Sequence, residues 1–194
     1  MSNLLQQLND ELAGVAERAR RSLVNISNGR RGDGAGTIWH PDGLILTNAH
    51  VVRLHSPRVT LPDGRTLPAR LLAHDSNLDL AALAVDAHGL PAIELGDSQQ
   101  LQPGQWVLAM GHPWGVAGAA TAGVVIGLGP SLEMAMPGRE LIHVGLHLRP
   151  GHSGGPLVDI AGRLVGVNTM MAGPDVGLAV PVHVAKTFLR QALP

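Results

Sequence analysis

The chain has 194 residues, with 14 Lys and Arg against 15 Asp and Glu, and therefore a formal net charge of −1. This balance gives no electrostatic reason to expect a nucleic-acid partner. The sequence has no cysteine, which excludes disulfides, thiolate metal sites and a cysteine nucleophile, and which is compatible with a reducing compartment.

Residues 1–21 are predicted to form an amphipathic helix that precedes the rest of the fold. Apolar side chains recur there at helical spacing, at Leu4, Leu5, Leu8, Leu12 and Val15. We favour a helix that lies on the first β-unit of the chain; the alternative is a contact between copies in a homo-oligomer. The segment lacks the basic start, the unbroken apolar core and the cleavage site of a secretory signal, so we expect a cytoplasmic protein.

Twelve short apolar runs, separated by turn signals, follow this helix. They lie at residues 23–27, 35–39, 44–47, 58–61, 68–73, 80–85, 106–110, 120–128, 141–148, 156–160, 163–168 and 177–181. Together with 25 glycines and 14 prolines, this pattern is typical of an all-β sandwich or barrel. The polar segment 91–105 is the natural connection between two halves of six runs each, and apolar positions within 181–193 predict a short closing helix.

The uncharged stretch from residue 98 to residue 132 raises the question of a membrane span. Three prolines interrupt it, and its most apolar part, residues 116–128, is shorter than the roughly 20 residues that a membrane helix needs. A buried β-hairpin explains the stretch better, so we expect no membrane partner.

Two segments in the first half of the chain carry candidate catalytic residues. His50 lies in the sequence TNAHVV, which follows an apolar run, and a histidine at the end of a strand can be held rigidly with one ring nitrogen facing a cleft. Asp79 opens the apolar run 80–83, so its carboxylate is expected to be buried and to need a partner such as an imidazole N–H. Asp75 is interpreted as a polar turn residue before that run.

The sequence GHSGGP at residues 151–156 predicts an activated nucleophile. A serine hydroxyl needs a base to take its proton and donors to stabilise the oxyanion that forms, and glycines on both sides let backbone N–H groups point into a site. The alternative is a tight surface turn. The chain order His50, Asp79, Ser153 is one of the known orders of the Ser–His–Asp triad, which favours the catalytic interpretation.

These motifs resemble one known family. TNAHVV, DSNLDLAAL and GHSGGPL, with DGAGTI at residues 33–38 and GVNT at residues 166–169, are similar to the HtrA/Deg branch of the trypsin-like serine proteases. The resemblance runs from about residue 22 to residue 192. It covers the protease domain only, and we expect no PDZ domain within the chain.

The resemblance implies an all-β fold of two six-stranded antiparallel β-barrels. Residues 22–100 would form the first barrel and carry His50 and Asp79, and residues 101–194 would form the second and carry Ser153. The backbone N–H groups of Gly151 and Ser153 would form the oxyanion hole. Apo structures of HtrA-like proteases often show that loop misfolded, so the sequence does not decide between an active and a latent resting conformation.

The resemblance also implies an activity. It would be a serine endopeptidase that cleaves unfolded polypeptides in protein quality control, through an acyl-enzyme on Ser153 and without any cofactor. The alternative is a catalytically weak or latent protease-fold module that acts as a peptide-binding or chaperone protein. A homo-oligomer is possible, but a chain with no Tyr and a single Phe cannot reproduce the aromatic trimer contacts of the family.

The chain departs from the family pattern next to the nucleophile. His152 replaces the usual Asn, and residues 143–150 lack the usual Gln-Thr-Asp-Ala pattern. His147 stands where trypsin keeps an acid, so cleavage after Lys or Arg is not expected. The resemblance places the substrate pocket at His147, Met170, Met171 and Leu178, which favours small aliphatic side chains; the alternative is that His147 recognises an acidic side chain.

The histidines also raise the question of a metal site. His143 and His147 alternate along a predicted strand and therefore share a face, and His152 follows nearby. No further ligand with a fixed geometry is evident, so we predict no metal. His112, in the sequence GHPWG, is interpreted as a loop residue.

Overall fold

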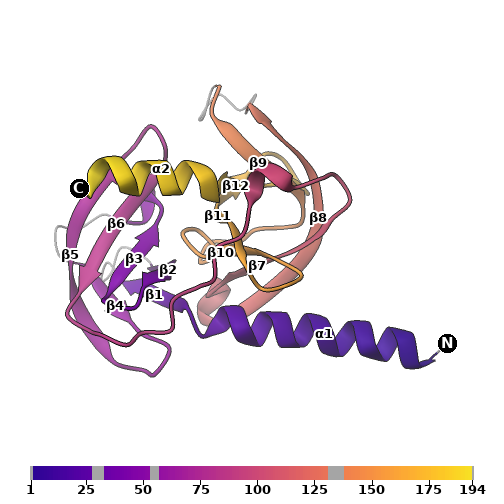
Figure 1. The fold of residues 1–194 in the computed structure, drawn as a ribbon, viewed down its shortest axis with the longest axis horizontal. Coiled ribbons are helices and arrows are strands. Elements are labelled where there is room, and N and C mark those ends of the chain that lie inside the picture. The colour runs from indigo at the N-terminus through magenta and orange to yellow at the C-terminus, as the bar shows by residue number, and fades with distance from the viewer. Residues whose placement is uncertain (1, 28–32, 53–56, 131–137, 194) are drawn as a thin grey trace.

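Two closed barrels of six antiparallel strands lie side by side in the computed structural model, which describes residues 2–27, 33–52, 57–130 and 138–193 (Figure 1). The first barrel consists of β1 (Leu23–Ser27), β2 (Asp33–His40), β3 (Leu44–Thr47), β4 (Arg58–Thr60), β5 (Thr66–Asp75) and β6 (Leu80–Val85). The second consists of β7 (Trp106–Gly111), β8 (Ala119–Pro130), β9 (Glu140–Gly145), β10 (Pro156–Asp159), β11 (Leu164–Met171) and β12 (Gly177–Pro181). The predicted all-β fold with two barrels is confirmed.

The strand order explains why separate parts of the chain meet at one end of each barrel. In the first barrel the order is β1-β2-β3-β6-β5-β4, and in the second it is β10-β11-β12-β9-β8-β7. Thr47, the last residue of β3, pairs with Ala81 near the start of β6. The residues just after β3 therefore lie beside those just before β6, although about thirty positions separate them in sequence.

The two barrels share a continuous apolar interface. Leu46 and Leu80 of the first barrel belong to one buried cluster with Val167 and Leu178 of the second, and Phe188 of the C-terminal helix joins them. Burial of side chains of this size contributes roughly 1.5–3 kcal/mol each. The interface therefore fixes the two barrels, and the groups at their seam, relative to one another.

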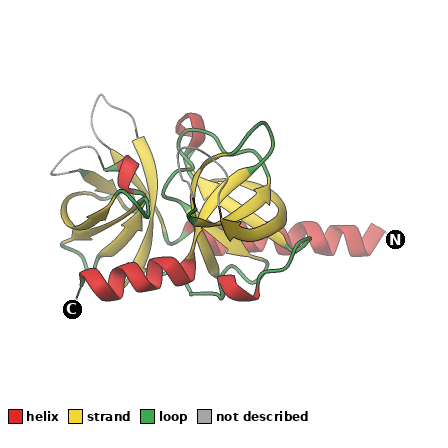
Figure 2. Ribbon diagram, turned by 90° about the horizontal axis from the view of Figure 1, so that it is seen from above, coloured by secondary structure: helices red, strands yellow, loops and turns green. Residues whose placement is uncertain are grey.

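Helix α2 (Val182–Ala192) closes the fold and spans the two barrels (Figures 1 and 2). Its buried face carries Ala185, Phe188 and Leu189, which recur at the spacing of one helical stripe. It contacts β11 and β12 of the second barrel and β6 of the first. The closing helix predicted within residues 181–193 is confirmed.

Helix α1 (Ser2–Arg20) does not lie on the first barrel in the way that was predicted. Val15 and Ala19 are buried, and they pack mainly with residues of the second barrel, such as Leu108 in β7 and Leu164 in β11, rather than on the first barrel alone. The N-terminal part of the helix extends past the barrels (Figure 1), and its side chains Leu4, Leu5 and Leu8 are exposed.

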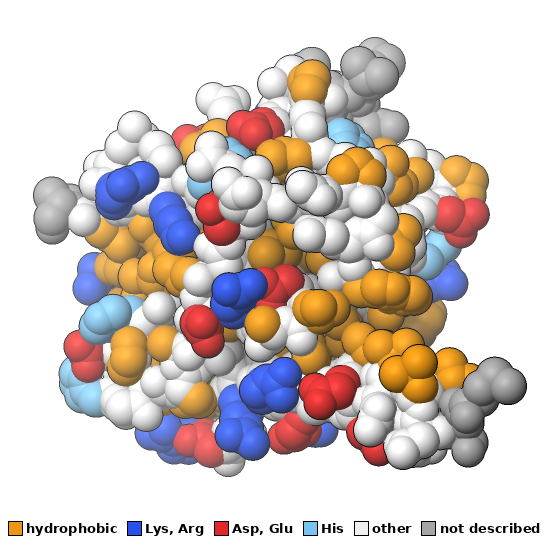
Figure 3. All heavy atoms as spheres, turned by 45° about the vertical axis from the view of Figure 1, so that its right-hand side comes forward, with side chains coloured by type: hydrophobic (Ala, Val, Ile, Leu, Met, Phe, Trp, Pro, Cys, Tyr) orange, Lys and Arg blue, Asp and Glu red, His pale blue; other side chains and the backbone are white. Residues whose placement is uncertain are grey.

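Apolar side chains are prominent on the face of the molecule drawn in Figure 3. Within the described residues, no helix has both the length and the apolar character needed to cross a membrane.

The strand ends differ from the predicted ranges at two places that matter for the site. β9 ends at Gly145, not at residue 148, because the chain leaves the barrel there and enters the loop that leads to Ser153. β11 continues to Met171, beyond the predicted end at residue 168, since Met170 and Met171 pair with Leu178 and Gly177 of β12.

Candidate active site

His50 lies in the short helical turn η2 (Ala49–Val51), directly after β3. Its ring Nδ1 lies 2.9 Å from both carboxylate oxygens of Asp79, and its backbone N–H donates to Asp79 Oδ1 at 3.1 Å. The His50 side chain is 42% exposed, whereas that of Asp79 is 6% exposed. One edge of the imidazole is thus bound to a buried carboxylate while the ring remains accessible.

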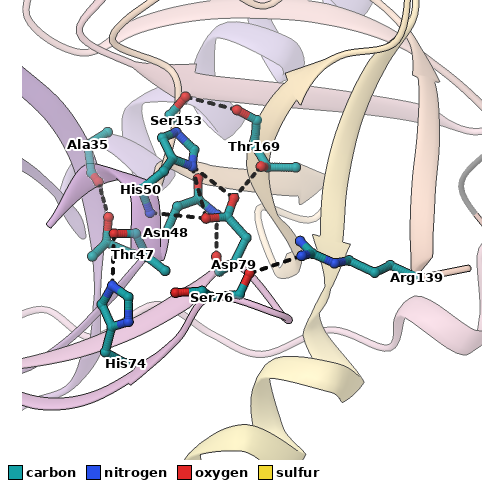
Figure 4. Close-up of polar contacts among 11 residues, drawn as sticks. Ala35, Thr47, Asn48, His50, His74, Ser76, Asp79, Arg139, Ser153 and Thr169 are labelled. Carbon is teal, nitrogen blue, oxygen red and sulfur yellow. Dashed lines mark hydrogen bonds and ion pairs between the residues drawn. The ribbon is translucent and has the colours of Figure 1, made fainter. Parts of the chain in front are cut away.

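Asp79 is held by its backbone as well as by its side chain. Asp75 Oδ1 accepts the N–H groups of Asn77 and Leu78, which forms the turn expected of Asp75, and Asp79 follows with φ +55. Asn48 donates its side-chain N–H to the Asp79 carbonyl at 2.9 Å. The left-handed backbone conformation of Asp79 is unusual for a residue other than glycine, and it turns the Asp79 carboxylate toward His50 (Figure 4).

Asp79 remains a carboxylate in the neutral pH range. Burial raises its pKa, but hydrogen bonds and the charge of His50, together with the hydroxyl of Thr169, outweigh burial and lower the pKa below its ordinary value. Thr169 Oγ1 donates to Asp79 Oδ2 from the second barrel. The carboxylate therefore binds groups from both barrels.

Ser153 reaches the same place from the second barrel. It precedes β10, whose Pro156 pairs with Val167 of β11, so Ser153 lies beside the end of β11. Its Oγ donates to the Thr169 carbonyl at 2.9 Å. Figure 4 shows Ser153 next to the His50 ring, with Asp79 on the other side of that ring. The structure therefore brings together the three residues of the predicted triad.

The serine is fixed to the first barrel by backbone contacts. Its carbonyl accepts the N–H of Ala35 at 2.8 Å, and the Ala35 carbonyl accepts the hydroxyl of Thr47 at 2.7 Å. Gly154 fits between them with φ +84, where a Cβ would collide with Ala35 O and Thr47 Oγ1. Only glycine suits this position, because a side chain would push the nucleophile away from the seam.

The loop before the nucleophile leaves two donors available. Gly151, with φ +104, turns its carbonyl toward the N–H of His112, which donates to it at 2.8 Å. In the described part of the chain, neither the N–H of Gly151 nor that of Ser153 has a hydrogen-bond partner. Two free backbone donors, one on the nucleophile itself and one two residues before it, can form an oxyanion hole.

His152 points into the protein rather than into the cleft. The residue is 3% exposed; its Nδ1 accepts the N–H of Arg149 at 3.1 Å, and its buried Nε2 has no partner within the described residues. Burial lowers the pKa of His152, and nearby Arg149 and His112 act in the same direction, whereas the backbone of Arg149 opposes it. His152 is therefore a neutral internal support of the loop.

This burial has a consequence for stability. Below its ordinary pKa near 6.5, His152 takes up a proton in the unfolded chain but resists it in the folded one, so the free energy of unfolding falls as the pH drops. One such proton contributes a slope of at most about 1.4 kcal/mol per pH unit. In His152→Asn, whose Oδ1 can replace Nδ1 as acceptor, we expect a smaller loss of stability between pH 7 and pH 5.

Urea unfolding at several pH values measures this difference. His88→Asn is the matched control, because the His88 side chain is 77% exposed, and it should follow the wild type. Equal pH slopes for His152→Asn and the wild type would contradict a buried neutral His152.

Of the residues predicted to line the substrate pocket, Leu178 lies elsewhere in the structure, and the pocket itself stays a prediction. Leu178 is fully buried in the interface between the barrels and presents no surface to a substrate, because it faces the core side of β12. His147 is partly exposed, with Nδ1 3.8 Å from Asp175 Oδ1. Met170 is half-buried, and Met171 Sδ accepts the N–H of Leu148 at 3.1 Å.

Within the described part of the chain, the histidines do not gather into a metal site. His152 is buried under the loop, while His147 faces Asp175. Among the residues that the structure describes, no group of three or more His, Cys, Asp or Glu could hold a metal ion. His112 is a loop residue as predicted, and its ring Nδ1 accepts the N–H of Gly118 at 3.3 Å.

Two residues of the site were not found by sequence reasoning. Thr169 binds Asp79 and Ser153, and Asn48 fixes the backbone of Asp79. Both lie inside motifs noted for their resemblance, TNAHVV and GVNT, but a threonine or asparagine at a strand end gives no signal of its own until the partner strand is known.

Comparison with known proteins agrees with this geometry. The model of the trypsin-like peptidase domain matches residues 34–167. The chain is 40% identical over 162 residues to HhoB of Synechocystis sp., which is named as a serine protease, and this match covers 80% of the chain and 39% of the relative. It is 38% identical over 167 residues to the mitochondrial serine protease HTRA2 of Drosophila pseudoobscura, with 82% and 39% covered.

A solved structure, the HtrA-type protease AlgW with tripeptide, superimposes with a TM-score of 0.87 at 33% identity, covering 92% of this chain and 62% of that one. The chain spans about two fifths of the length of the curated relatives. It therefore belongs to the trypsin-like peptidase family, and its relatives place it in the HtrA-type branch of that family.

Proposed function

We propose that this protein is a serine endopeptidase that hydrolyses peptide bonds of unfolded polypeptides through an acyl-enzyme on Ser153. The observation that carries the proposal is the convergence at the barrel seam of His50 bound to Asp79, with Ser153 beside the ring and two free N–H donors next to it. The HtrA-type relatives support the same reaction.

The hydrogen bonds support a distinct role for each side chain. Because Asp79 accepts the Nδ1 proton of His50, the neutral imidazole keeps its Nε2 lone pair and can act as a base. His50 takes the Ser153 hydroxyl proton as Oγ attacks the peptide carbonyl, and then returns that proton to the departing amine. Asp79, ionised at neutral pH, stabilises the imidazolium between these two steps.

The second half of the reaction uses the same groups. Water attacks the acyl-enzyme, His50 accepts a proton from it, and Ser153 leaves with that proton, which releases the carboxylic acid product. In both halves the N–H groups of Gly151 and Ser153 would bind the oxyanion of the tetrahedral intermediate. Thr169 holds the carboxylate of Asp79 in place and so acts as a positioning residue.

The proposal includes a preference of the enzyme for the type of substrate side chain that precedes the scissile bond. His147 and Met170 would line that pocket, since both are partly exposed on the segments that flank Ser153 in space. Asp175 Oδ1 already lies 3.8 Å from His147 Nδ1, so a carboxylate stands where an acidic substrate side chain would have to bind. This pairing favours a small aliphatic side chain over an acidic one.

The proposal is tested with unfolded casein and the purified protein. We expect the wild type to degrade casein at neutral pH and Ser153→Ala to lose at least about 10⁴-fold in turnover, because no other described group can replace the nucleophile. Ser76→Ala is the matched control, since Ser76 lies in an exposed turn, and it should retain full activity.

Two results would overturn the proposal. One is equal casein turnover by the wild type and Ser153→Ala, which would point to a contaminating protease. The other is an inert wild type that still binds unfolded casein, which would favour the peptide-binding module instead.

A further inference from the structure

Trp114 has an environment that the catalytic mechanism does not explain. It lies in the turn between β7 and β8 with φ +54 and ψ +22, a left-handed conformation that bulky side chains rarely adopt. The residue is 76% exposed, so burial in the core does not account for a tryptophan at this place. A tryptophan in this conformation at the surface therefore suggests that its indole makes a contact outside the core.

The indole contacts the loop that carries the nucleophile. The guanidinium carbon of Arg149 lies 5.2 Å from the ring centroid of Trp114, within the range of a cation–π interaction. The backbone of Arg149 closes the turn around the loop: its carbonyl accepts the N–H of His152 at 2.9 Å, and its N–H donates to His152 Nδ1 at 3.1 Å. Trp114 thus holds the residue at which this turn begins.

Backbone contacts join the same two loops at a second point. The N–H of His112 donates to the Gly151 carbonyl at 2.8 Å, and a Cβ on Gly111 would meet that carbonyl oxygen at 2.5 Å. The turn after β7 is itself closed by the bond from Gly118 N–H to His112 Nδ1. It therefore forms a support against which the peptide of Gly151 is oriented.

We propose that Trp114 and Arg149 form a latch that holds residues 149–153 in the conformation with the N–H groups of Gly151 and Ser153 free to bind the substrate oxyanion. The inference rests on the proposed endopeptidase function and adds two positioning residues to it. Within the described residues, neither side chain forms a hydrogen bond or ion pair with the triad, so the latch acts through the loop. Opening of the latch lowers the fraction of molecules with a formed oxyanion hole, which reduces turnover and leaves ground-state binding of the peptide unchanged.

A double-mutant cycle tests the latch. Trp114→Asn keeps a residue that tolerates the left-handed backbone, and Arg149→Gln keeps a polar side chain without the charge. With an internally quenched peptide as substrate, we expect each single variant to lower kcat by about two- to fivefold with KM unchanged. The double variant should be no slower than the slower single variant, because the two residues act as one contact.

Two further variants separate a latch from a general structural role. Trp114→Phe keeps an aromatic face and should recover most of the lost kcat. Trp106→Asn removes the 50% exposed tryptophan of β7, which is not part of the latch, and should leave kcat unchanged. Rates are expressed per active site labelled by a fluorophosphonate, so that unfolded molecules do not enter kcat.

The possible results are distinct. An inactive wild type would contradict the proposed function itself. With an active wild type, three results would overturn the latch alone: an unchanged kcat in Trp114→Asn, losses that multiply in the double variant, or a rise in KM without a fall in kcat, which would make Trp114 a substrate contact.

Discussion

Replacing Asp79 with asparagine is expected to lower kcat by about 10⁴-fold, with the fold retained. The Asp79 carboxylate accepts three hydrogen bonds from His50 and Thr169 within the described site. An amide can turn its NH₂ toward His50 Nδ1, which then has to act as the acceptor. The ring proton would move to Nε2, and the imidazole could no longer take the proton of Ser153.

Steady-state hydrolysis of a peptide substrate measures this effect. Asp63→Asn is the matched control, because Asp63 is an exposed carboxylate of the same barrel that pairs with Arg65, and its activity should equal that of the wild type. A loss of less than tenfold in a folded Asp79→Asn variant would show that the Asp79 carboxylate does not set the tautomer of His50.

A methyl group on Gly151 is expected to lower kcat by about 10²–10³-fold, the cost of losing one oxyanion donor. Gly151 has φ +104, and the added Cβ would lie 2.6 Å from the backbone oxygen of His112. The loop therefore has to move, and the N–H of Gly151 moves with it. Because His50 and Asp79 lie on other segments and Ser153 is itself held by Ala35 and Thr169, labelling of Ser153 by a fluorophosphonate should slow less than turnover of a peptide does.

Gly104→Ala isolates the effect of the clash from that of the backbone strain. Gly104 has φ +89 in a turn before β7, and nothing lies within 4 Å of an added Cβ there. Both variants introduce strain, which thermal unfolding measures, but only Gly151→Ala should lose kcat. Equal kcat values for the two variants would contradict the assignment of Gly151 to the oxyanion hole.

Much of the fold was predictable because its signals are local. Several strands are short apolar runs next to turn residues, and the run at residues 80–85, between Asp79 and Asp86, coincides with β6. The two-barrel arrangement came from the resemblance of the motifs, since runs of this kind fit a sandwich equally well. Predicted ends were wrong where the chain leaves a barrel to build the site, as at Gly145, because a tertiary turn and not local propensity ends β9 there.

The site was predictable to the extent that its residues carry rare sequence patterns. His50, Asp79 and Ser153 each lie in a distinctive motif, and the structure brings them to one seam. Thr169 and Asn48 could not be found in this way, because their roles depend on which strands are neighbours.

The direction in which a side chain points was the other feature that the sequence did not predict. Leu178 was assigned to the substrate pocket, but it points into the buried interface, since neighbouring residues of a strand face opposite sides. The contact of Arg149 with Trp114 joins residues 35 positions apart in two loops, and loop conformations leave little periodic signal in a sequence.

The most direct test is the reaction of the purified protein with a fluorophosphonate probe, followed by mass spectrometry of the labelled peptide. An activated hydroxyl at the junction of the barrels predicts one adduct per chain, on Ser153, and its disappearance in His50→Ala. A chain that stays unlabelled at every pH between 6 and 9, or one labelled equally well without His50, would contradict the account.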